Sequence, residues 1–577
     1  MTMDWQVEGK NAVAPFTLKL HRGEGMVLIA MNWRQGEPPL DFVGFAVEYL
    51  PPDGDRFYAI KNRIAFPGRD KPSEDGAPPE QYPTTEAPLQ SFRWIHFPRI
   101  ANVHGLFTYR VTPMFMNAAG ELSRGLAQEA QISLYAETLP GKINVAFTRG
   151  YVSSQSFVDR YGGAEGFKKL IPAKADEGND FVSTHPKAKD AYAWMGFEAR
   201  ARIVGLLDAA IEDEAAEVMV VAYELNLPEL IERLAKIGPR LRIILDDSGS
   251  GAKDKGLPHS AESRAPPVLA AAGAKVVRQK MGNLQHNKMI VVDGPTVQQV
   301  VLGSTNFSWR GFYVQANNAL IVTGKAIVAQ QRDAFEAYWN GTAASFAASG
   351  AATWRPLQVE GLDAEIAMSP HNAARSTQKS IGQAIDGAQS SLFYSLAFLS
   401  QTSGEVTDAI LRATARSDLF VYGIANAPVG ATEEMQLRQP DGNLASVSPA
   451  ALTKGVPEPF HSEASGGGGI KMHHKFVVID FNKPSARVYT GSYNFSYPAD
   501  MQNGENLVVI RDPRFATSYM VEALRIFDAY QYRLAAKDQQ EQGKRKELKI
   551  PPTDGALPWW KKFYTVPVKI RDRELFA

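Results

Sequence analysis

Residues 471–480, KMHHKFVVID, begin one residue after four consecutive glycines and contain the apolar stretch FVVI. Only ten histidines occur in the 577 residues, and two of them stand side by side here. A polar entrance to a buried strand is the simplest interpretation. A second stretch, QHNKMIVVDG at 285–294, argues against it, because both stretches contain His-x-Lys-x-x-x-x-Asp. The repeated residues are His286, Lys288 and Asp293 in the first copy and His473, Lys475 and Asp480 in the second.

Each copy is followed by Gly-Ser-x-Asn-Phe-Ser, at 303–308 and at 491–496. On an extended strand, the His and Lys of His-x-Lys point to the same face, about 7 Å apart. Two such strands brought together would place two imidazoles and two ammonium groups around one point. A phosphodiester suits that point, because one imidazole can attack phosphorus while the other protonates the leaving oxygen.

The surrounding chain is organised in two matching series of elements. From Ile143, apolar strands alternate with expected helices at 191–213, 227–237, 260–272 and 325–340. After Pro356 a second series follows, with expected helices at 374–388, 404–416 and 513–537. The series correspond element by element, which predicts an internal duplication of an α/β unit. The nearly all-apolar strands are typical of sheets covered on both faces.

Residues 1–140 have a different texture. Aromatic and β-branched runs such as MVLIAMNW and LFTYRVTPMFM alternate with Pro, Gly and Asp, without a helix-length amphipathic segment. This pattern predicts an antiparallel sandwich, similar to an immunoglobulin or fibronectin type III module. The length favours about two to four domains. We expect an accessory sandwich at 1–140 and two halves of the duplicated unit at 141–350 and 351–577.

Composition excludes several classes of function. The chain has no cysteine, so disulfides, cysteine nucleophiles and thiolate metal sites are ruled out. Lys plus Arg and Asp plus Glu both number 62, which gives no general field for nucleic acid or an anionic membrane. We see no signal peptide and no apolar run long enough for a membrane span, so we expect a cytoplasmic protein, with leaderless export left open.

The two motifs resemble those of the phospholipase D superfamily, from about residue 143 onward. The resemblance implies a multidomain protein in which the sandwich precedes a duplicated α/β phospholipase D-like fold with pseudo-twofold symmetry. It also implies a metal-independent phosphodiesterase without a cofactor that works through a phosphohistidine. The expected catalytic residues are His286, Lys288, Asn306, His473, Lys475, Asn494 and Glu505.

The lysines and the amides of Asn306 and Asn494 would hold the non-bridging oxygens. Supporting roles are expected for Ser304 and Ser492, which shape the turns. Asp293 and Asp480 close strands and are expected to be structural.

Two further histidines are not expected to act in the site. His474 points away from His473 and should pack, and His461 should lie in an exposed loop.

The two halves differ at one informative position. Aligning NGENLVVI with QANNALIV sets Glu505 opposite Asn317. In the family, an acidic residue here orients the histidine of the opposite half through Nδ1, so Glu505 would serve His286 and Asn317 or Gln315 would serve His473. This difference favours His286 as the nucleophile and His473 as the general acid.

The leading hypothesis is hydrolysis of a phospholipid head group; the alternatives are a metal-independent endonuclease and, more remotely, an inactive binding module. Peripheral membrane contact is compatible with this sequence, and no oligomer is required for the site. Polar insertions at about 152–190 and 427–470 are candidates for substrate selection. The glycines at 466–469 would let the second insertion hinge.

Overall fold

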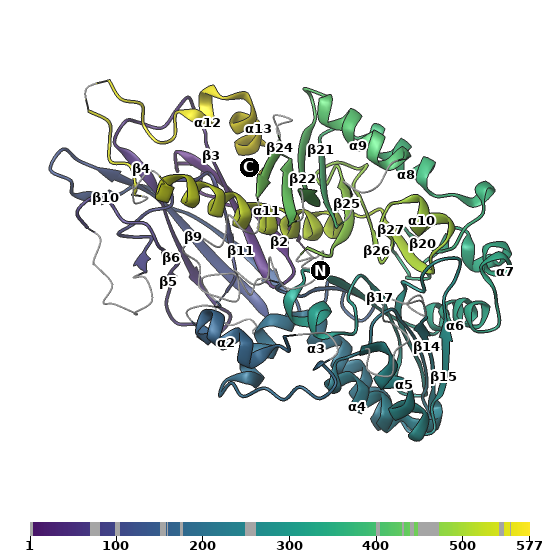
Figure 1. Ribbon diagram of the computed structural model, residues 1–577. Helices are drawn as coiled ribbons and strands as arrows, with labels where there is room; N and C mark the ends of the chain where they lie inside the picture. Colours follow the sequence, from purple (N-terminus) through teal and green to yellow (C-terminus); the bar gives the residue numbers. More distant parts are fainter. Residues whose placement is uncertain are drawn as a thin grey trace. The chain divides into compact units, whose positions relative to one another are not determined.

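The computed structural model describes residues 4–69, 81–98, 104–150, 157, 160–173, 177–247, 261–397, 399, 404–429, 432–438, 444–447, 472–541, 547–553 and 555–577 (Figure 1). The chain divides into two compact units. One comprises residues 1–136 and 517–577, and the other comprises residues 137–516.

The first unit contains two antiparallel sheets that share one hydrophobic core. Alternating side chains such as Phe16 and Leu18 face Phe45 and Val47 of the other sheet in this core. One sheet has the order β1 (Gln6–Glu8), β2 (Phe16–Gly23), β3 (Met26–Trp33), β8 (Arg93–His96). The other has the order β10 (Leu122–Arg124), β9 (Gly105–Met116), β4 (Phe42–Leu50), β5 (Tyr58–Ala59), with β11 (Gln128–Leu134) paired to β9. A further two-stranded sheet joins β6 (Lys61–Asn62) and β7 (Tyr82–Pro83).

The C-terminal residues belong to this first unit, and not to the second half of the duplication as the sequence led us to expect. Trp559 packs on Phe42 and Phe92 with ring centroids 5.5 Å away in each case. The helices there are most of α11 (Pro513–Glu541), α12 (Lys562–Thr565) and α13 (Pro567–Phe576). Trp559 and Trp560, which precede α12, and Phe563 within α12 are part of the same core as the strands.

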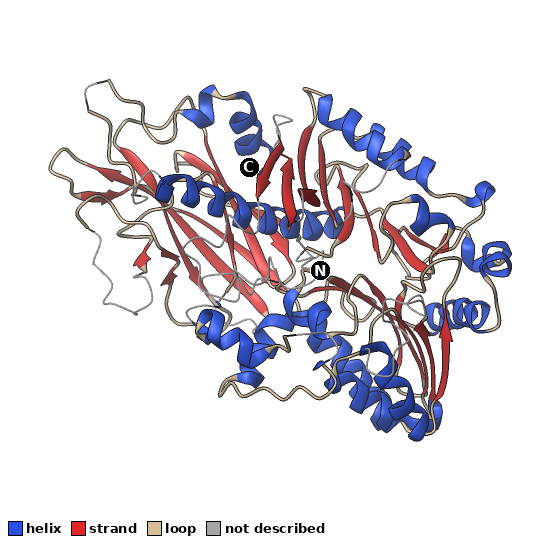
Figure 2. Cartoon of the chain, viewed as in Figure 1, coloured by secondary structure: helices blue, strands red, loops and turns tan. Residues whose placement is uncertain are grey.

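The second unit is built on two mixed sheets, shown as red arrows in Figure 2. The seven-stranded sheet has the order β12 (Ile143–Phe147), β18 (Asn318–Thr323), β17 (Gln298–Gly303), β16 (Lys288–Asp293), β13 (Glu217–Ala222), β14 (Leu241–Asp246), β15 (Lys275–Gln279). The nine-stranded sheet has the order β19 (Arg355–Pro356), β20 (Ala364–Ser369), β27 (Glu505–Ile510), β26 (Arg487–Gly491), β25 (Lys475–Ile479), β21 (Ser391–Leu396), β22 (Phe420–Val429), β23 (Thr432–Arg438), β24 (Leu444–Val447).

The central strands of the two sheets follow the same order. From β12 to β14 and from β20 to β22, each sheet has four antiparallel pairings and then a parallel one. The strand that begins at the motif lysine, β16 or β25, has the same neighbours in both sheets. On one side lies the strand that ends at the glycine of Gly-Ser-x-Asn, β17 or β26, and on the other lies β13 or β21. The start of β16 and the start of β25 therefore occupy equivalent places.

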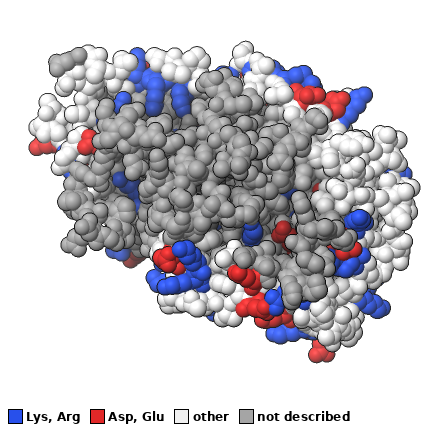
Figure 3. Space-filling view, in the orientation of Figure 1, with Lys and Arg blue, Asp and Glu red and all other residues white. Residues whose placement is uncertain are grey.

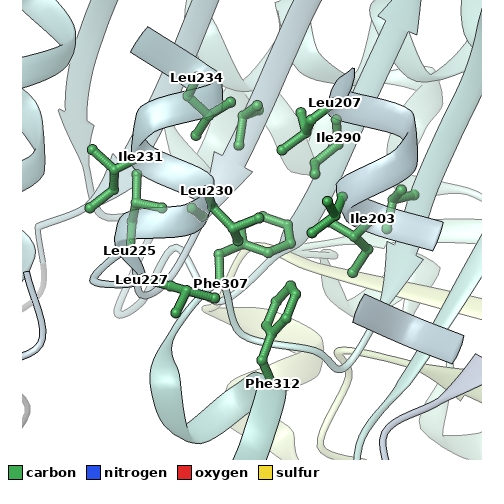
Figure 4. Close-up of a cluster of buried hydrophobic side chains, with 14 of the residues drawn as sticks. Ile203, Leu207, Leu225, Leu227, Leu230, Ile231, Leu234, Ile290, Phe307 and Phe312 are labelled. Carbon is green, nitrogen blue, oxygen red and sulfur yellow. The ribbon is translucent and has the colours of Figure 1, made fainter. Parts of the chain in front are cut away.

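Helices cover the first of these sheets on both faces. Val218 and Val220 of β13 face a cluster that includes α3 (Ala188–Glu212) and α4 (Pro228–Ile237), where Leu230 and Phe307 meet (Figure 4). The intervening Met219 and Val221 are also buried, and α6 (Lys325–Trp339) contacts the same strand. The remaining helices of the unit are α2 (Gly163–Leu170), α5 (Ala261–Ala271), α7 (Ala343–Ala348), α8 (Gln378–Asp386), α9 (Glu405–Ala415) and α10 (Tyr497–Met501).

Candidate active site

Two short backbone contacts bring the motifs together. Gln285, just before His286, pairs with Gly504, and Met472, just before His473, pairs with Ala316. Each motif histidine is thereby placed beside a residue of the other sheet. His286 meets Glu505 and His473 meets Asn317, as the alignment of the two halves suggested.

Both imidazoles are held from behind through Nδ1. His286 Nδ1 lies 2.9 Å from each carboxylate oxygen of Glu505, and His473 Nδ1 lies 2.8 Å from Oδ1 of Asn317. Because Oδ1 of an amide can only accept, Nδ1 of His473 carries the hydrogen and Nε2 is its basic nitrogen. The two rings are edge to face, with centroids 6.4 Å apart. A single tetrahedral phosphorus centre can be reached from both rings at this separation.

The serines of the two motif loops support these acceptors in the same way. Ser304 donates to Oδ1 of Asn317 at 2.9 Å, and Ser492 donates to Oε2 of Glu505 at 2.6 Å. Asn503 adds a hydrogen bond of 3.3 Å to Oε1 of Glu505. The acceptor behind each histidine is therefore itself fixed.

Both motif lysines are buried beside the histidines. Lys288 donates to the backbone oxygen of His286, and Lys475 donates to that of His473 at 2.8 Å. Burial and the charge of Lys288 hold the pKa of Lys475 well below its usual value, whereas Glu505 and Glu224 raise it. Two clustered cations of this kind gain stability when an anion enters between them.

Burial also shifts the pKa values of Glu505 and His473. It raises the pKa of Glu505 to about 8, against the lowering effects of Lys288 and of the hydrogen bond from Ser492. Burial, with the charges of Lys475 and Lys288, holds the pKa of His473 well below 6.5. Without an anionic ligand, His473 is therefore neutral at neutral pH.

Both motif asparagines have an unsatisfied amide oxygen. The Oδ1 atoms of Asn306 and Asn494 are both buried and have no hydrogen-bond partner in the described structure. Such an atom reduces stability unless a ligand satisfies the group. Oδ1 can only accept, so a phosphate oxygen would have to be bound by the Nδ2 group of each amide.

The aspartates that end the motifs lie at the far ends of their strands, about 17 Å from the lysines. Asp293 forms an ion pair of 2.6 Å with Arg332. Asp480 accepts backbone N–H groups of Gln389 and Ser390 at 2.7–3.0 Å, and its own φ is +53°. Both carboxylates hold local structure there.

His474 lies on the opposite face from His473. Its ring packs against Phe147 and Phe476, with centroids 5.7 and 5.1 Å away. His461 and the glycines at 466–469 fall outside the described residues, as does most of the insertion at 427–470.

Two residues that the sequence did not single out lie at the end of β13, beside the start of β16. The Tyr223 ring lies 4.7 Å from the ring of His286 and 4.8 Å from Nζ of Lys288. Glu224 accepts a hydrogen bond of 2.8 Å from Ser308, the last residue of the first motif loop. Only the strand order brings these residues to the motif, so no local pattern could have identified them.

The described residues contain no group of three or more His, Cys, Asp or Glu side chains arranged to hold a metal ion. None of the described helices is both long enough and apolar enough to cross a membrane.

Comparison with known proteins gives short and partial matches at the level of single relatives. A phospholipase D of Rickettsia bellii is 46% identical over 48 residues, which are 8% of this chain and 22% of that protein. A phospholipase D of Rickettsia conorii is 44% identical over 48 residues, with the same coverage. The chain thus spans about a fifth of the length of the curated relatives it matches.

Among solved structures, the phosphatidylserine synthase of Haemophilus influenzae is 14% identical, with a TM-score of 0.34, over 66% of this chain and 94% of that one. Nuc of Salmonella typhimurium, a phospholipase D family member, is 21% identical, with a TM-score of 0.20, over 25% of this chain and 87% of that one. TM-scores at this level do not establish a shared arrangement.

The family comparison is the informative one. A family model described as "Cardiolipin synthase, PLD-like domain" matches residues 213–339 and 381–527. The first matched segment contains His286 and Lys288, and the second contains His473 and Lys475. Because the match recurs on both halves and each time spans one complete motif, the chain belongs to the phospholipase D superfamily.

Proposed function

We propose that this protein hydrolyses the head-group phosphodiester of a phospholipid through a covalent phosphohistidine. The observation that carries the proposal is the pair of facing imidazoles, each fixed through Nδ1, with two buried lysines beside them. Nucleophile, proton donor and charge stabilisation are then all supplied by side chains around one point.

In the first step, Nε2 of His286 attacks phosphorus and the bond to the leaving oxygen breaks. The proton on Nε2 of His473 passes to that oxygen, so an alcohol departs. Lys288 and Lys475, with the amides of Asn306 and Asn494, hold the non-bridging oxygens as charge builds on them. In its ionised form Glu505 stabilises the positive charge that forms on His286, and because its pKa is raised to about 8 the ionised fraction grows as pH rises toward that value.

The low pKa of His473 fits this role once substrate is considered. The lysines are part of what keeps the imidazole neutral, and a phosphodiester anion between them offsets their charge. Substrate binding therefore raises the pKa of His473 and creates the acid that the first step needs.

In the second step, a water molecule takes the place of the departed alcohol. Neutral His473 accepts a proton from this water as its oxygen bonds to phosphorus, and the bond from phosphorus to Nε2 of His286 breaks. The phosphomonoester leaves, and both histidines return to their initial states.

We further infer that residues 137–516 are two pseudo-symmetric halves derived from one duplicated unit. The matching strand orders and the equivalent serine contacts support this inference. Each histidine takes its partner from the other half, so neither half should cleave a phosphodiester as an isolated monomer. We assign residues 1–136 to an accessory role, with the immunoglobulin or fibronectin type III likeness left as a prediction.

A specific observation favours lipid over nucleic acid. The partly exposed carboxylate of Glu224 lies close enough to Lys475 to influence its protonation. A chain of phosphates across the site would meet this negative charge, whereas a single diester can avoid it. On the face drawn in Figure 3, acidic and basic side chains lie next to each other among the coloured residues. Cytoplasmic location and peripheral contact with a membrane stay predictions.

The deciding experiment offers the purified protein three substrates with no added metal: dihexanoyl phosphatidylcholine, bis-p-nitrophenyl phosphate and plasmid DNA. We expect cleavage of the lipid and of the aryl diester, unchanged by EDTA and lost in His286→Asn. Efficient cleavage of DNA with no release of choline would establish the endonuclease instead. Loss of activity on chelation, restored by a divalent ion, would contradict the metal-independent mechanism.

A further inference from the structure

A second buried histidine and carboxylate lie outside the motifs in the second unit. His371 Nδ1 is 2.8 Å from Oδ1 of Asp500, and the two side chains are 0% and 1% exposed. The backbone N–H of His371 also donates to the backbone oxygen of Asp500, at 2.7 Å. Neither residue belongs to the recognised motifs or to the proposed chemistry.

Asp500 is the centre of a hydrogen-bond network. Its carboxylate accepts from Ser376 Oγ at 2.6 Å, from Thr377 N at 3.2 Å and Oγ1 at 2.9 Å, and from Tyr493 OH at 2.9 Å, besides His371. Although burial raises the pKa of Asp500, the hydrogen bond from His371 and the others bring it below its usual value. The group is therefore a buried anion satisfied from several sides.

The network fixes the loop that carries catalytic groups at both of its ends. Tyr493 stands between Ser492, which donates to Glu505, and Asn494, which is one of the expected catalytic residues. At the other end, Ser369 donates to the backbone oxygens of Ala499, at 2.7 Å, and Asn503, at 2.9 Å. Asp500 thus ties the segment from residue 492 to 505 to the strand end that precedes His371.

The first half holds its equivalent loop differently. The segments 303–318 and 491–506 have the same length, so Phe312 occupies the place of Asp500 and Gly150 that of His371. Phe312 packs in the apolar cluster of Figure 4. The first loop is also anchored on carboxylates, since Ser308 donates to Glu224 at 2.8 Å and Tyr313 donates to Glu229 at 2.9 Å. Both of these carboxylates are partly exposed, whereas Asp500 is fully buried.

The hydrogen bonding of His371 also supports a role in holding Asp500. Its Nε2 atom is buried and has no hydrogen-bond partner in the described structure. An apolar side chain could fill the same space without burying an unsatisfied nitrogen. The imidazole of His371 leaves Nε2 unsatisfied, and the hydrogen bond from Nδ1 to Asp500 is what it provides in return.

We propose that Asp500, held by His371, is a positioning residue that sets the geometry of Glu505 against His286 through Tyr493 and the 492–505 loop. The proposal rests on the proposed function, because it assigns Asp500 a part in preparing the nucleophile. It predicts that the carboxylate is needed for attack on phosphorus and not for substrate binding.

A double-mutant cycle tests it with methyl p-nitrophenyl phosphate. Asp500→Asn should lower kcat about 10- to 100-fold with KM within about twofold, and Tyr493→Phe, a milder change, should lower kcat in the same sense. Added to Glu505→Gln, Asp500→Asn should have little further effect, because both changes remove the same positioning. Fully additive effects would overturn the proposal.

Asp480→Asn is the matched control, since Asp480 is another buried carboxylate that accepts backbone N–H groups at the far end of β25. Asp480→Asn should lower the melting temperature, and its effect on kcat should add to that of Glu505→Gln. If Asp480→Asn and Asp500→Asn give the same kcat pattern, Asp500 has only a structural role.

A readout independent of turnover separates this proposal from the proposed function. The Nδ1 proton of His286 should give a low-field proton resonance that is absent in His286→Asn and Glu505→Gln. We expect it to shift or broaden in Asp500→Asn and Tyr493→Phe, and to stay unchanged in Asp480→Asn. An unchanged resonance in Asp500→Asn would refute the positioning role. If the resonance shifts in Asp500→Asn but the wild-type protein cleaves no phosphodiester, only the proposed function is refuted.

Discussion

At the scale of the residue, the two halves of the site differ by one ionisable group. Glu505 behind His286 and Asn317 behind His473 occupy equivalent places and receive equivalent serine hydrogen bonds. A carboxylate stabilises an imidazolium, whereas an amide oxygen only fixes a tautomer. The two histidines therefore have different chemistry in an otherwise matched frame.

The first prediction separates their roles. Because His473 protonates the leaving group, His473→Asn should slow departure of an alkoxide such as choline about 10²- to 10⁴-fold. Departure of p-nitrophenolate, which needs little protonation, should change far less. His286→Asn should abolish both, and Glu505→Gln should reduce both by the same factor. Rate constants for the two classes of diester check this.

The same assignment fixes where the covalent intermediate forms. A slow substrate labelled in its phosphoryl group should leave acid-labile label on the peptide that contains His286. Label on the peptide that contains His473 would reverse the two roles.

The second prediction concerns pH and stability. With a folded-state pKa of about 8 against 4.5 when unfolded, Glu505 keeps a proton in the folded protein that the unfolded chain releases. Its contribution to the free energy of unfolding therefore falls as pH rises from about 4.5 to 8, by at most about 1.4 kcal/mol per pH unit. Glu505→Gln should melt higher than the wild type, with a larger difference at pH 8 than at pH 5. A difference independent of pH between these values would disprove the shift.

At the scale of the element, strands and helices with strong periodicity were predictable from the sequence. The helix expected at 325–340 is found at Lys325–Trp339, and the one at 227–237 is Pro228–Ile237. In the stretch 427–470, where we predicted a polar insertion and identified no strand, β23 and β24 extend the sheet. Both belong to local antiparallel pairings, β23 with β22 and β24 with β23, since Val429 lies opposite Thr432 and Met435 lies opposite Val447. The mainly polar composition therefore concealed them, and not distance along the chain.

The site was predictable to the same extent. Motif spacing and alignment of the halves identified the two histidines and their Nδ1 partners, because both signals are local in sequence. Tyr223, Glu224 and Asp500 were not found, because they reach the site through strand order and loop anchoring alone.

A third prediction tests the backbone of the motif loops. Gly491 has a φ of +146°, and a Cβ there would lie 2.2 Å from the backbone oxygen of Asn506. Gly324 has a φ of +137° with nothing within 4 Å of such a Cβ. Gly491→Ala should therefore lower the free energy of unfolding by about 1–3 kcal/mol more than Gly324→Ala, measured by urea titration. Equal losses would mean that the conformation alone, and not the close approach, requires glycine.

At the scale of the whole molecule, the beginning and end of the chain form one compact unit. Besides Trp559, Phe563 packs on Phe92 at 5.2 Å, and Arg93 pairs with Asp572 at 2.7 Å. The sequence predicted an accessory domain made of residues 1–140 alone. Because residues 517–577 complete its core, that expectation has to be changed.

The fourth prediction follows from this pairing. A fragment of residues 137–577 should expose Trp559, Trp560 and Phe563, bind an apolar dye and aggregate. A fragment of residues 137–516, which lacks both parts of the first unit, should bind less dye and cleave a small aryl diester. Gel filtration and dye fluorescence of the two fragments provide the measurement. A monodisperse 137–577 fragment that binds no dye would show that the aromatic side chains do not need the N-terminal sheets.

The exchange of partners between halves has a consequence for how such a site can specialise. In a symmetric dimer of one half, both histidines must have the same residue behind them. Either histidine could then act as the nucleophile, so the substrate could bind in two equivalent orientations. In a single chain this restriction does not apply, because positions 317 and 505 can carry different residues. The orientation in which a substrate is processed is thereby encoded in two side chains 188 residues apart. Exchanging Asn317 and Glu505 should therefore exchange the roles of the two histidines and reverse the orientation in which the substrate is processed.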